Sequence, residues 1–461
     1  MQRLFAIIWL TWKAALRFRL FLVIAVLLLA AVVGLPLLIK DDGTARGFTQ
    51  ILLTYTLSAI TGLLGLSTLW LSCGILARDI EECQMQVVAT KPIARWQIWL
   101  GKWLGLVTLN AALLALAGGS VFVMLQYRAT KLPANEQAIL RNEVFIARGS
   151  AREKDLSGEI DAEVEKHFAR LGDKVKDLPP AQLAQSRKEV REYVKTGFQV
   201  VRPGDYRVWE IHVGNSRRDL PLQLRVKFNS SESRAAATYG ALWQVGTPEK
   251  IKVPWRTEEP MSLAPDTFHE FTVPPGLVDD AGVLTIVFIN PNQAALLFPL
   301  EDGMEVLFPE AGFALNFARG LGIILCWMSF LAALGLAAAS LLSFPVAAFF
   351  SLAMLILGLS SGTLSAAIEN GTIAGRDEET GATTGSVLDS VALPAFKGAL
   401  TLINMVENYS PIDSLSTGRS ISWGELGSAF THIVLLLGGA FGVVGIFCFN
   451  RRELATAQGT S

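Results

Sequence analysis

The chain has 461 residues, of which 51% are hydrophobic and 18% charged, and its formal net charge is −1. Charges of both signs gather in one internal block without a basic stripe, so we expect no nucleic-acid partner. The four cysteines all lie outside that block, which excludes a disulfide framework in it, and their spacing fits no zinc site.

Residues 1–19 predict an amphipathic helix at a membrane surface. Its apolar residues include two tryptophans, Trp9 and Trp12, and three cations, Arg3, Lys13 and Arg17, accompany them. A secretory signal peptide is the alternative, but the apolar run that follows is too long for one. We therefore expect an interfacial helix that leads into a first membrane span.

Uncharged stretches long enough to cross a bilayer predict six transmembrane helices. One run, 320–368, is too long for a single span, and Pro345 marks its break. The predicted spans are 20–39, 51–77, 103–127, 320–342, 346–368 and 426–450. They group into two membrane regions, 20–127 and 315–450.

The short segments that carry the basic residues set the expected topology. Cations precede the first span, lie between the second and third, and follow the last as Arg451 and Arg452. An even number of spans then places both termini and the tail 451–461 in the cytoplasm. The block 128–314 and the loop 369–425 lie outside, and the expected location is the cytoplasmic (inner) membrane.

The block 128–314 predicts an extracytoplasmic α+β domain. Helical spacing covers 132–200, and alternation of apolar and polar residues covers 205–310. At least seven short strands at this spacing favour a β-sandwich, jelly-roll-like in its topology. The predicted fold class is thus a polytopic α-helical membrane protein with an α+β insert that ends in a β-sandwich.

Two sets of side chains in this domain could bind a ligand or could have a purely structural role. His212 and His269 suggest copper, although two scattered histidines without Met or Cys make a poor soft-metal site. Trp209, Trp243 and Trp255 suggest a carbohydrate platform, although aromatics at strand spacing are more often core residues. We expect no metal ligands and no catalytic residues in this chain.

The segment 78–102 predicts a short amphipathic helix held between two spans. Thr90 can cap it, Pro92 fits its first turn, and Ile93, Trp96 and Trp99 are available to pack. Such a helix would move with the spans and could transmit a partner's conformational change. The alternative is a membrane-surface loop anchored by its tryptophans.

This segment resembles the first intracellular loop of type-2 ABC exporter permeases, in the branch connected with multi-copper enzyme maturation. The resemblance implies that the loop docks into a separate ABC ATPase subunit, that ATP and Mg²⁺ are bound there, and that a second permease copy, identical or paralogous, completes the transporter. The closing stretch 449–453 is similar to the family's C-terminal signature, whereas the large insert is not part of the family pattern. The residues that carry the coupling role by this resemblance are Asp79, Glu81, Glu82, Lys91, Pro92, Arg95, Gly101 and Lys102.

Polar residues inside the spans are candidates for a transport path, because they are costly in lipid. The candidates are Thr61, Asn110, Ser329 and His432, although hydroxyls in spans more often bond to their own helix. So few charges favour a hydrophobic or amphipathic substrate. The chain has no phosphate-binding loop, so it is expected to be non-catalytic.

Three functions remain open on this basis. The first is the permease subunit of an ABC exporter. The second is a scaffold that transmits motion from an internal ATPase to an extracytoplasmic partner with nothing transported. The third is a membrane-anchored module that binds glycans or cell-wall polymers, and six spans argue against it.

Overall fold

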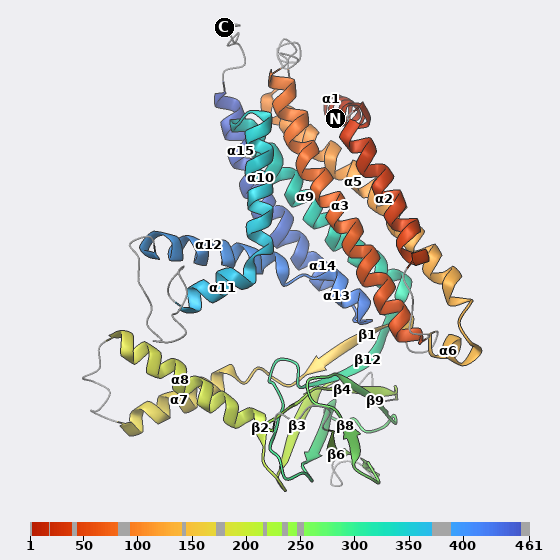
Figure 1. Cartoon of the computed structure of the whole chain (residues 1–461), viewed down its shortest axis with the longest axis vertical. Helices are drawn as coiled ribbons and strands as arrows, with labels where there is room; N and C mark the ends of the chain where they lie inside the picture. The colour runs from red at the N-terminus through yellow and green to blue at the C-terminus, as the bar shows by residue number, and fades with distance from the viewer. Residues whose placement is uncertain are drawn as a thin grey trace. The chain divides into compact units, whose positions relative to one another are not determined.

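The computed structural model describes residues 2–17, 19–38, 44–81, 93–140, 144–171, 180–214, 219–232, 238–246, 253–370 and 389–452. The chain divides into two compact units, Met1–Ala147 with Ala311–Ser461, and Arg148–Glu310. We call them the helical unit and the sheet unit (Figure 1). The chain passes between them inside β1 (Ile146–Arg152) and β12 (Met304–Gly312), which are neighbours in one sheet.

Long apolar helices form the helical unit, as the uncharged runs predict. Among the described residues, four helices are long and apolar enough to cross a membrane, 47–81, 95–129, 313–341 and 423–451, and the pair α1–α2 makes a fifth if counted as one span. The helices are α1 (Gln2–Arg17), α2 (Arg19–Leu38), α3 (Ala45–Glu81), α5 (Arg95–Ala129), α6 (Ala134–Ile139), α9 (Phe313–Leu341), α10 (Phe344–Leu359), α11 (Ser361–Asn370), α12 (Asp389–Glu407), α13 (Pro411–Ser416), α14 (Trp423–Ala429), the π-helix η4 (Phe430–Gly438) and α15 (Gly439–Arg451). The chain is therefore a membrane-embedded protein with a separate antiparallel-sheet part, which confirms the coarse fold class.

Helix α9 is the central helix of this unit. It packs against α3, α5, α10, η4 and α15, and its C-terminal half is buried along nearly every residue. Small side chains such as Ala332, Ala333 and Gly335 allow the close approach, since a Cβ on Gly335 would lie 3.0 Å from the Cβ of Ser72 on α3. Helices in lipid gain little from the hydrophobic effect, because lipid tails are as apolar as the side chains. Close packing of small residues therefore stabilises the association of these helices.

The predicted fifth span, 346–368, is not one continuous helix. α10 ends at Leu359 after 16 residues, and α11 begins at Ser361 in a new direction (Figure 1). At about 1.5 Å per residue, α10 is about 24 Å long, shorter than the roughly 30 Å hydrocarbon core. The sequence Ser360-Ser361-Gly362 explains the break, because serine and glycine are weak helix formers.

The N-terminal helix α1 is seated on α5. Its buried residues Ile7 and Thr11 face Gly101 and Gly105, where an added Cβ would lie 2.8 and 2.7 Å from their side chains. The indole of Trp12 donates a hydrogen bond of 3.1 Å to Thr108 Oγ1. Two glycines one turn apart therefore form the seat.

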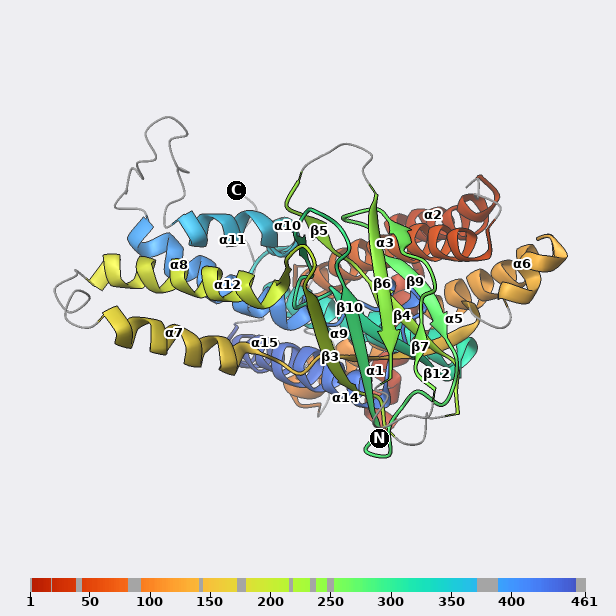
Figure 2. The ribbon, with the colours of Figure 1, turned by 90° about the horizontal axis from the view of Figure 1, so that it is seen from below.

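The sheet unit contains antiparallel strands in three sheets and a helical hairpin, which Figure 2 shows from below. The sheet orders are β1-β12-β4-β9, β3-β10-β6-β7 with β8 beside β6, and β2-β11-β5. The remaining elements are α7 (Ser157–Leu171), α8 (Pro180–Gln199), β2 (Val200–Val201), β3 (Tyr206–His212), β4 (Leu222–Val226), β5 (Asn229–Ser230), β6 (Tyr239–Val245), β7 (Trp255–Arg256), β8 (Met261–Leu263), β9 (His269–Val273), β10 (Val283–Ile289) and β11 (Leu296–Leu297).

An aromatic core joins the two larger sheets of this unit. Trp209 and Trp243 are 1% and 2% exposed, and Trp243 lies 4.9 Å from Phe288 between ring centroids. Strand β6 is buried at every second residue, as its alternating sequence requires. Because these two tryptophans are core residues, they cannot present a carbohydrate platform.

A row of alternating charges crosses the sheet that contains β1 and β12. Glu305 on β12 lies opposite Arg225 on β4, which lies opposite Glu270 on β9. Arg152 and Arg148 on β1 bind Glu305 and Glu270 at 3.2 and 2.9 Å. The side chain of Glu305 is only 3% exposed, so its two arginine partners must compensate a large desolvation penalty.

Replacement of Gly105 by leucine should displace α1 from its seat, because even a Cβ would clash with Thr11. We expect faster hydrogen exchange throughout α1, measured by mass spectrometry on the purified chain. Gly119→Leu on the same helix is the matched control, because a Cβ there meets nothing within 4 Å. Equal exchange in both variants would show that α1 is not held by this contact.

Replacement of Glu305 by glutamine should destabilise the sheet unit by about 3 kcal/mol, since breaking a buried pair leaves an uncompensated charge. Hydrogen exchange in β4 and β12 would measure the loss. Glu301→Gln is the control, because Glu301 is 65% exposed in its pair with Lys195 and such pairs contribute at most about 1 kcal/mol. Similar effects of the two changes would contradict the role assigned to the charge row.

Candidate functional site

The candidate site is the end of the helical unit where the residues of the expected coupling segment lie. Asp79, Glu81, Arg95, Gly101 and Lys102 are in the described residues. Glu82, Lys91 and Pro92 lie outside them, as does the expected cap Thr90. The geometry therefore concerns the two ends of the segment, at the C-terminus of α3 and the N-terminus of α5.

Lys102 joins these two helices. Its side chain is 8% exposed, and its Nζ donates to the carbonyl of Ile75 at 3.0 Å and forms an ion pair with Asp79 at 2.5 Å. Both partners lie in the last two turns of α3, where a cation also compensates the partial negative charge of the helix C-terminus. Two residues predicted to contact an ATPase are therefore partners of one another.

Arg95, the first residue of α5, binds the C-terminus of α15. Its Nη1 donates to the carbonyls of Phe449, Asn450 and Arg452 at 3.1, 2.9 and 3.0 Å. These carbonyls have no partner inside α15, because a helix leaves its last four carbonyls unpaired. Nearby, Trp99 is 2% exposed and packs on Gly442 and Gly445 of α15, so it is a packing residue and not an interface anchor.

Arg452 binds the unpaired carbonyls at the C-terminus of α9 in the same way. Its Nη1 donates to the carbonyls of Ala339, Ser340 and Leu342 at 3.0, 3.2 and 3.4 Å. At the end of α3, the carboxylate of Glu81 accepts a hydrogen bond of 2.9 Å from the backbone N–H of Phe344. Phe344 is the first residue of α10. Arg78 lies over the ring of Phe344 at 4.6 Å.

These contacts form a closed circuit of helix ends, which we call the helix-end ring: Asp79, Glu81, Arg95, Lys102 and Arg452. Lys102 joins α5 to α3, Arg95 joins α5 to α15, and Arg452 joins the end of α15 to α9. The chain continues from α9 into α10, and Glu81 joins α10 back to α3. A displacement of either end of the segment 82–92 must therefore move all five helices or break one of these bonds. Sequence reasoning placed Arg452 in the tail signature but missed its role; an arginine directly after the last span was the available signal.

Within the described residues, no hydrogen bond joins the predicted transport-path residues to one another. Asn110 is 4% exposed and its Oδ1 accepts from Thr68 of α3 at 3.1 Å, while Ser329 donates to Leu325 of its own helix at 2.7 Å. Thr61 has a buried Oγ1 that lacks a partner in the described part of the chain. His432 lies in η4 and contacts Tyr409 at 3.0 Å.

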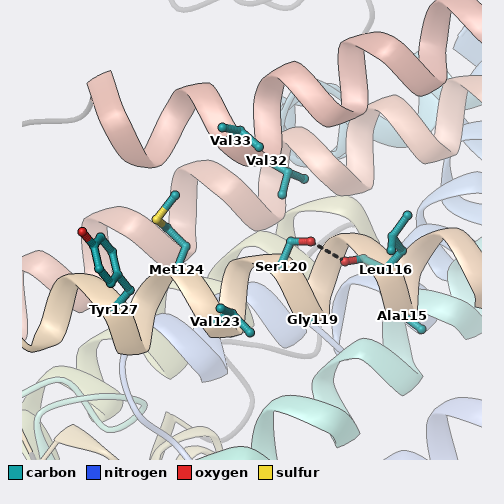
Figure 3. A pocket seen from close by; sticks show the side chains of 9 residues that line it. All are labelled: Val32, Val33, Ala115, Leu116, Gly119, Ser120, Val123, Met124 and Tyr127. Carbon is teal, nitrogen blue, oxygen red and sulfur yellow. Dashed lines mark hydrogen bonds between the residues drawn. The ribbon is translucent and has the colours of Figure 1, made fainter.

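An open groove lies elsewhere in the helical unit, between α2 and α5 (Figure 3). It has a volume of about 600 Å³ and an almost wholly apolar lining. The hydroxyl of Ser120 donates to Leu116 of its own helix at 2.8 Å, so it adds little polarity. None of the four transport-path candidates lines this groove.

No group of three or more His, Cys, Asp or Glu residues able to hold a metal ion occurs within the described ranges. His212 and His269 lie on different sheets, and His269 Nε2 contacts the carbonyl of Ala264 at 2.8 Å. No family model, curated protein or solved structure matches this chain.

Removal of one partner of the Lys102–Asp79 pair should destabilise the helical unit more than removal of both. Lys102→Met leaves Asp79 without its cation, whereas the double variant Asp79→Asn/Lys102→Met leaves no charge. We expect a coupling free energy of about 1–3 kcal/mol from unfolding of the four forms. The exposed pair Lys166–Glu163 on α7 is the control and should give no measurable coupling.

Proposed function

We propose that this chain is the membrane-spanning subunit of an ATP-driven ABC transporter, an exporter of a hydrophobic or amphipathic substrate. A separate ABC ATPase would bind ATP and Mg²⁺, and a second permease copy would complete a dimer. The observation that carries the proposal is the helix-end ring, because it ties both ends of the expected coupling segment to five helices of the helical unit, α3, α5, α9, α10 and α15.

The ring supports coupling through its geometry. A partner that pushed on the segment 82–92 would act on α3 through Asp79 and on α5 through Arg95 and Lys102. The bonds of Arg95 and Arg452 would carry the displacement to α15 and then to α9, the central helix. Rigid transmission of this kind needs no contact between the ATPase and the remaining helices.

The proposed orientation places the helix-end ring and both termini in the cytoplasm, in the inner membrane. Six crossings follow, the fifth formed by α10 together with the start of α11. The sheet unit would then be extracytoplasmic, with its two larger sheets packed as a sandwich around the shared aromatic core. Arg78, Arg95, Lys102, Arg451 and Arg452 at the ring end support this orientation by the bias of cations toward the cytoplasm.

The apolar groove between α2 and α5 favours a lipid-like substrate over an ion. Its lining contains one hydroxyl already bonded within its own helix and the phenol of Tyr127 at one end (Figure 3). Such a surface stabilises acyl chains and offers no ligands for an ion.

A second candidate function is transmission of motion to an extracytoplasmic partner with nothing transported. One observation favours it: Asn110, Ser329 and His432 are hydrogen-bonded within the chain, so their polar groups already have partners.

Arg452→Gln should separate coupling from binding. The chain would be co-expressed with the ABC ATPase encoded nearest to it, co-purified, and assayed for ATP turnover in lipid nanodiscs. We expect the variant to retain the ATPase but to lose most lipid-dependent turnover, because the hydrogen bonds of Arg452 no longer tie the C-terminus of α15 to that of α9. Arg451→Gln is the matched control, since Arg451 stacks on Phe447 of its own helix and is not in the ring.

Failure of the wild-type chain to bind any ABC ATPase would overturn the proposed function. Equal turnover in the Arg452→Gln and Arg451→Gln complexes would show that the ring does not transmit. Flux of a fluorescent lipid into proteoliposomes would separate the two candidate functions, because only the transporter moves substrate.

A further inference from the structure

A buried cation lies near the end of α9 opposite the helix-end ring. Arg319 is in the second turn of this membrane-length helix and is 8% exposed. Its Nη1 donates to the carbonyl of Ile421 at 2.9 Å. Asn316, one turn earlier, fixes the same segment: it donates to the carbonyl of Arg419 and accepts the N–H of Ile421, both at 2.7 Å.

No carboxylate compensates the charge of Arg319 within the described residues. Its one hydrogen bond goes to a neutral carbonyl, and its buried Nε has no partner there. A buried ionised group without a counter-charge is strongly destabilising, and charged residues in membrane helices usually mark a functional contact. Something of opposite charge is expected beside this guanidinium.

Two further features lie on the same segment. The hydroxyl of Ser420 is buried and has no hydrogen-bond partner in the described part of the chain. The ring of Trp423 lies over the guanidinium of Arg319 at 4.6 Å, and this tryptophan is 63% exposed. The guanidinium with the unused Nε donor therefore lies beside an exposed aromatic ring of the kind that occupies the headgroup level of a membrane, and Ser420 adds a second unused donor three residues before that tryptophan.

We propose that Arg319, Ser420 and Trp423 form a binding site for an oxyanion, a phosphate or carboxylate group. The oxygen atoms would accept from Arg319 Nε and from the Ser420 hydroxyl, and the apolar part of the ligand would contact the Trp423 ring. An oxyanion fits because the site offers donors and positive charge. A phospholipid headgroup and a soluble anion share this chemistry, and the site does not depend on the proposed transport function.

The competing explanation is that Arg319 serves only to hold the 419–421 segment through Ile421. The two explanations differ at Ser420, whose hydroxyl makes no hydrogen bond to the described part of the chain. Without a ligand, Ser420→Ala removes an unsatisfied buried hydroxyl and should leave stability unchanged or raise it. With a ligand, the same change removes a hydrogen bond and lowers affinity.

The test measures binding of phosphatidylglycerol and of inorganic phosphate to the delipidated full chain, by native mass spectrometry and by the shift in thermal unfolding midpoint. We expect one phosphatidylglycerol per chain, bound at least about tenfold more weakly by Arg319→Gln and several-fold more weakly by Ser420→Ala. Arg451→Gln should bind as the wild type does, because it makes the same chemical change beside an aromatic ring at the other end of the unit.

Each outcome decides the question. Binding of phosphatidylglycerol that depends on Arg319 and Ser420 supports a lipid headgroup as the source, and equal dependence for inorganic phosphate without lipid supports a soluble anion. If neither probe distinguishes the wild type from Ser420→Ala, the proposal is overturned and Arg319 is structural. Ser420→Ala keeps this test valid even if Arg319→Gln fails to fold.

Discussion

Unpaired backbone groups at helix ends are the constraint on which the helical unit depends. A helix leaves four N–H and four C=O groups without partners, and in a membrane protein water satisfies them only outside the hydrocarbon. At the ring end, Arg95 and Arg452 bind the last carbonyls of α15 and α9, and Glu81 accepts the first N–H of α10. Lys102 binds the carbonyl of Ile75, in the second-last turn of α3. Each of these side chains belongs to a different helix from the one it caps. Capping and helix association are thus one interaction, which is why a charge change here is expected to affect several helices.

The two units hold their arginines in different ways. In the sheet unit, Arg148, Arg152 and Arg225 are balanced by Glu270 and Glu305 of the same sheet. In the helical unit, Arg95 and Arg452 instead bind clusters of three carbonyls. Carbonyls at a helix C-terminus carry partial negative charge in a fixed place, so they can hold a cation without a second ionised group being buried.

Several elements could be predicted from the sequence because their signal is local. The uncharged runs located α3, α5, α9 and the η4–α15 helix, and alternation of apolar and polar residues located β3 and β6. The apolar run between turn residues located β10. The break at Ser360 was missed because the run 346–368 was judged by its lack of charge, and hydropathy does not report the weak helix propensity of Ser360, Ser361 and Gly362. The partners of Asp79, Arg95 and Arg452 could not be predicted, since each contact joins residues from separate helices. Arg319 was missed for a simpler reason: the predicted span began one residue after it, although α9 begins at Phe313.

The electrostatic environment of an arginine differs between the two ends of α9. At its C-terminus, Arg452 meets three carbonyls whose partial negative charge favours a cation. Near its N-terminus, Arg319 lies close to the positive pole of the same helix, so the helix supplies no compensation there. The single carbonyl of Ile421 is a weak substitute for an ionised partner. An oxyanion at this position would be attracted by both the guanidinium and the helix, which makes it the simplest group that balances the charge of this end.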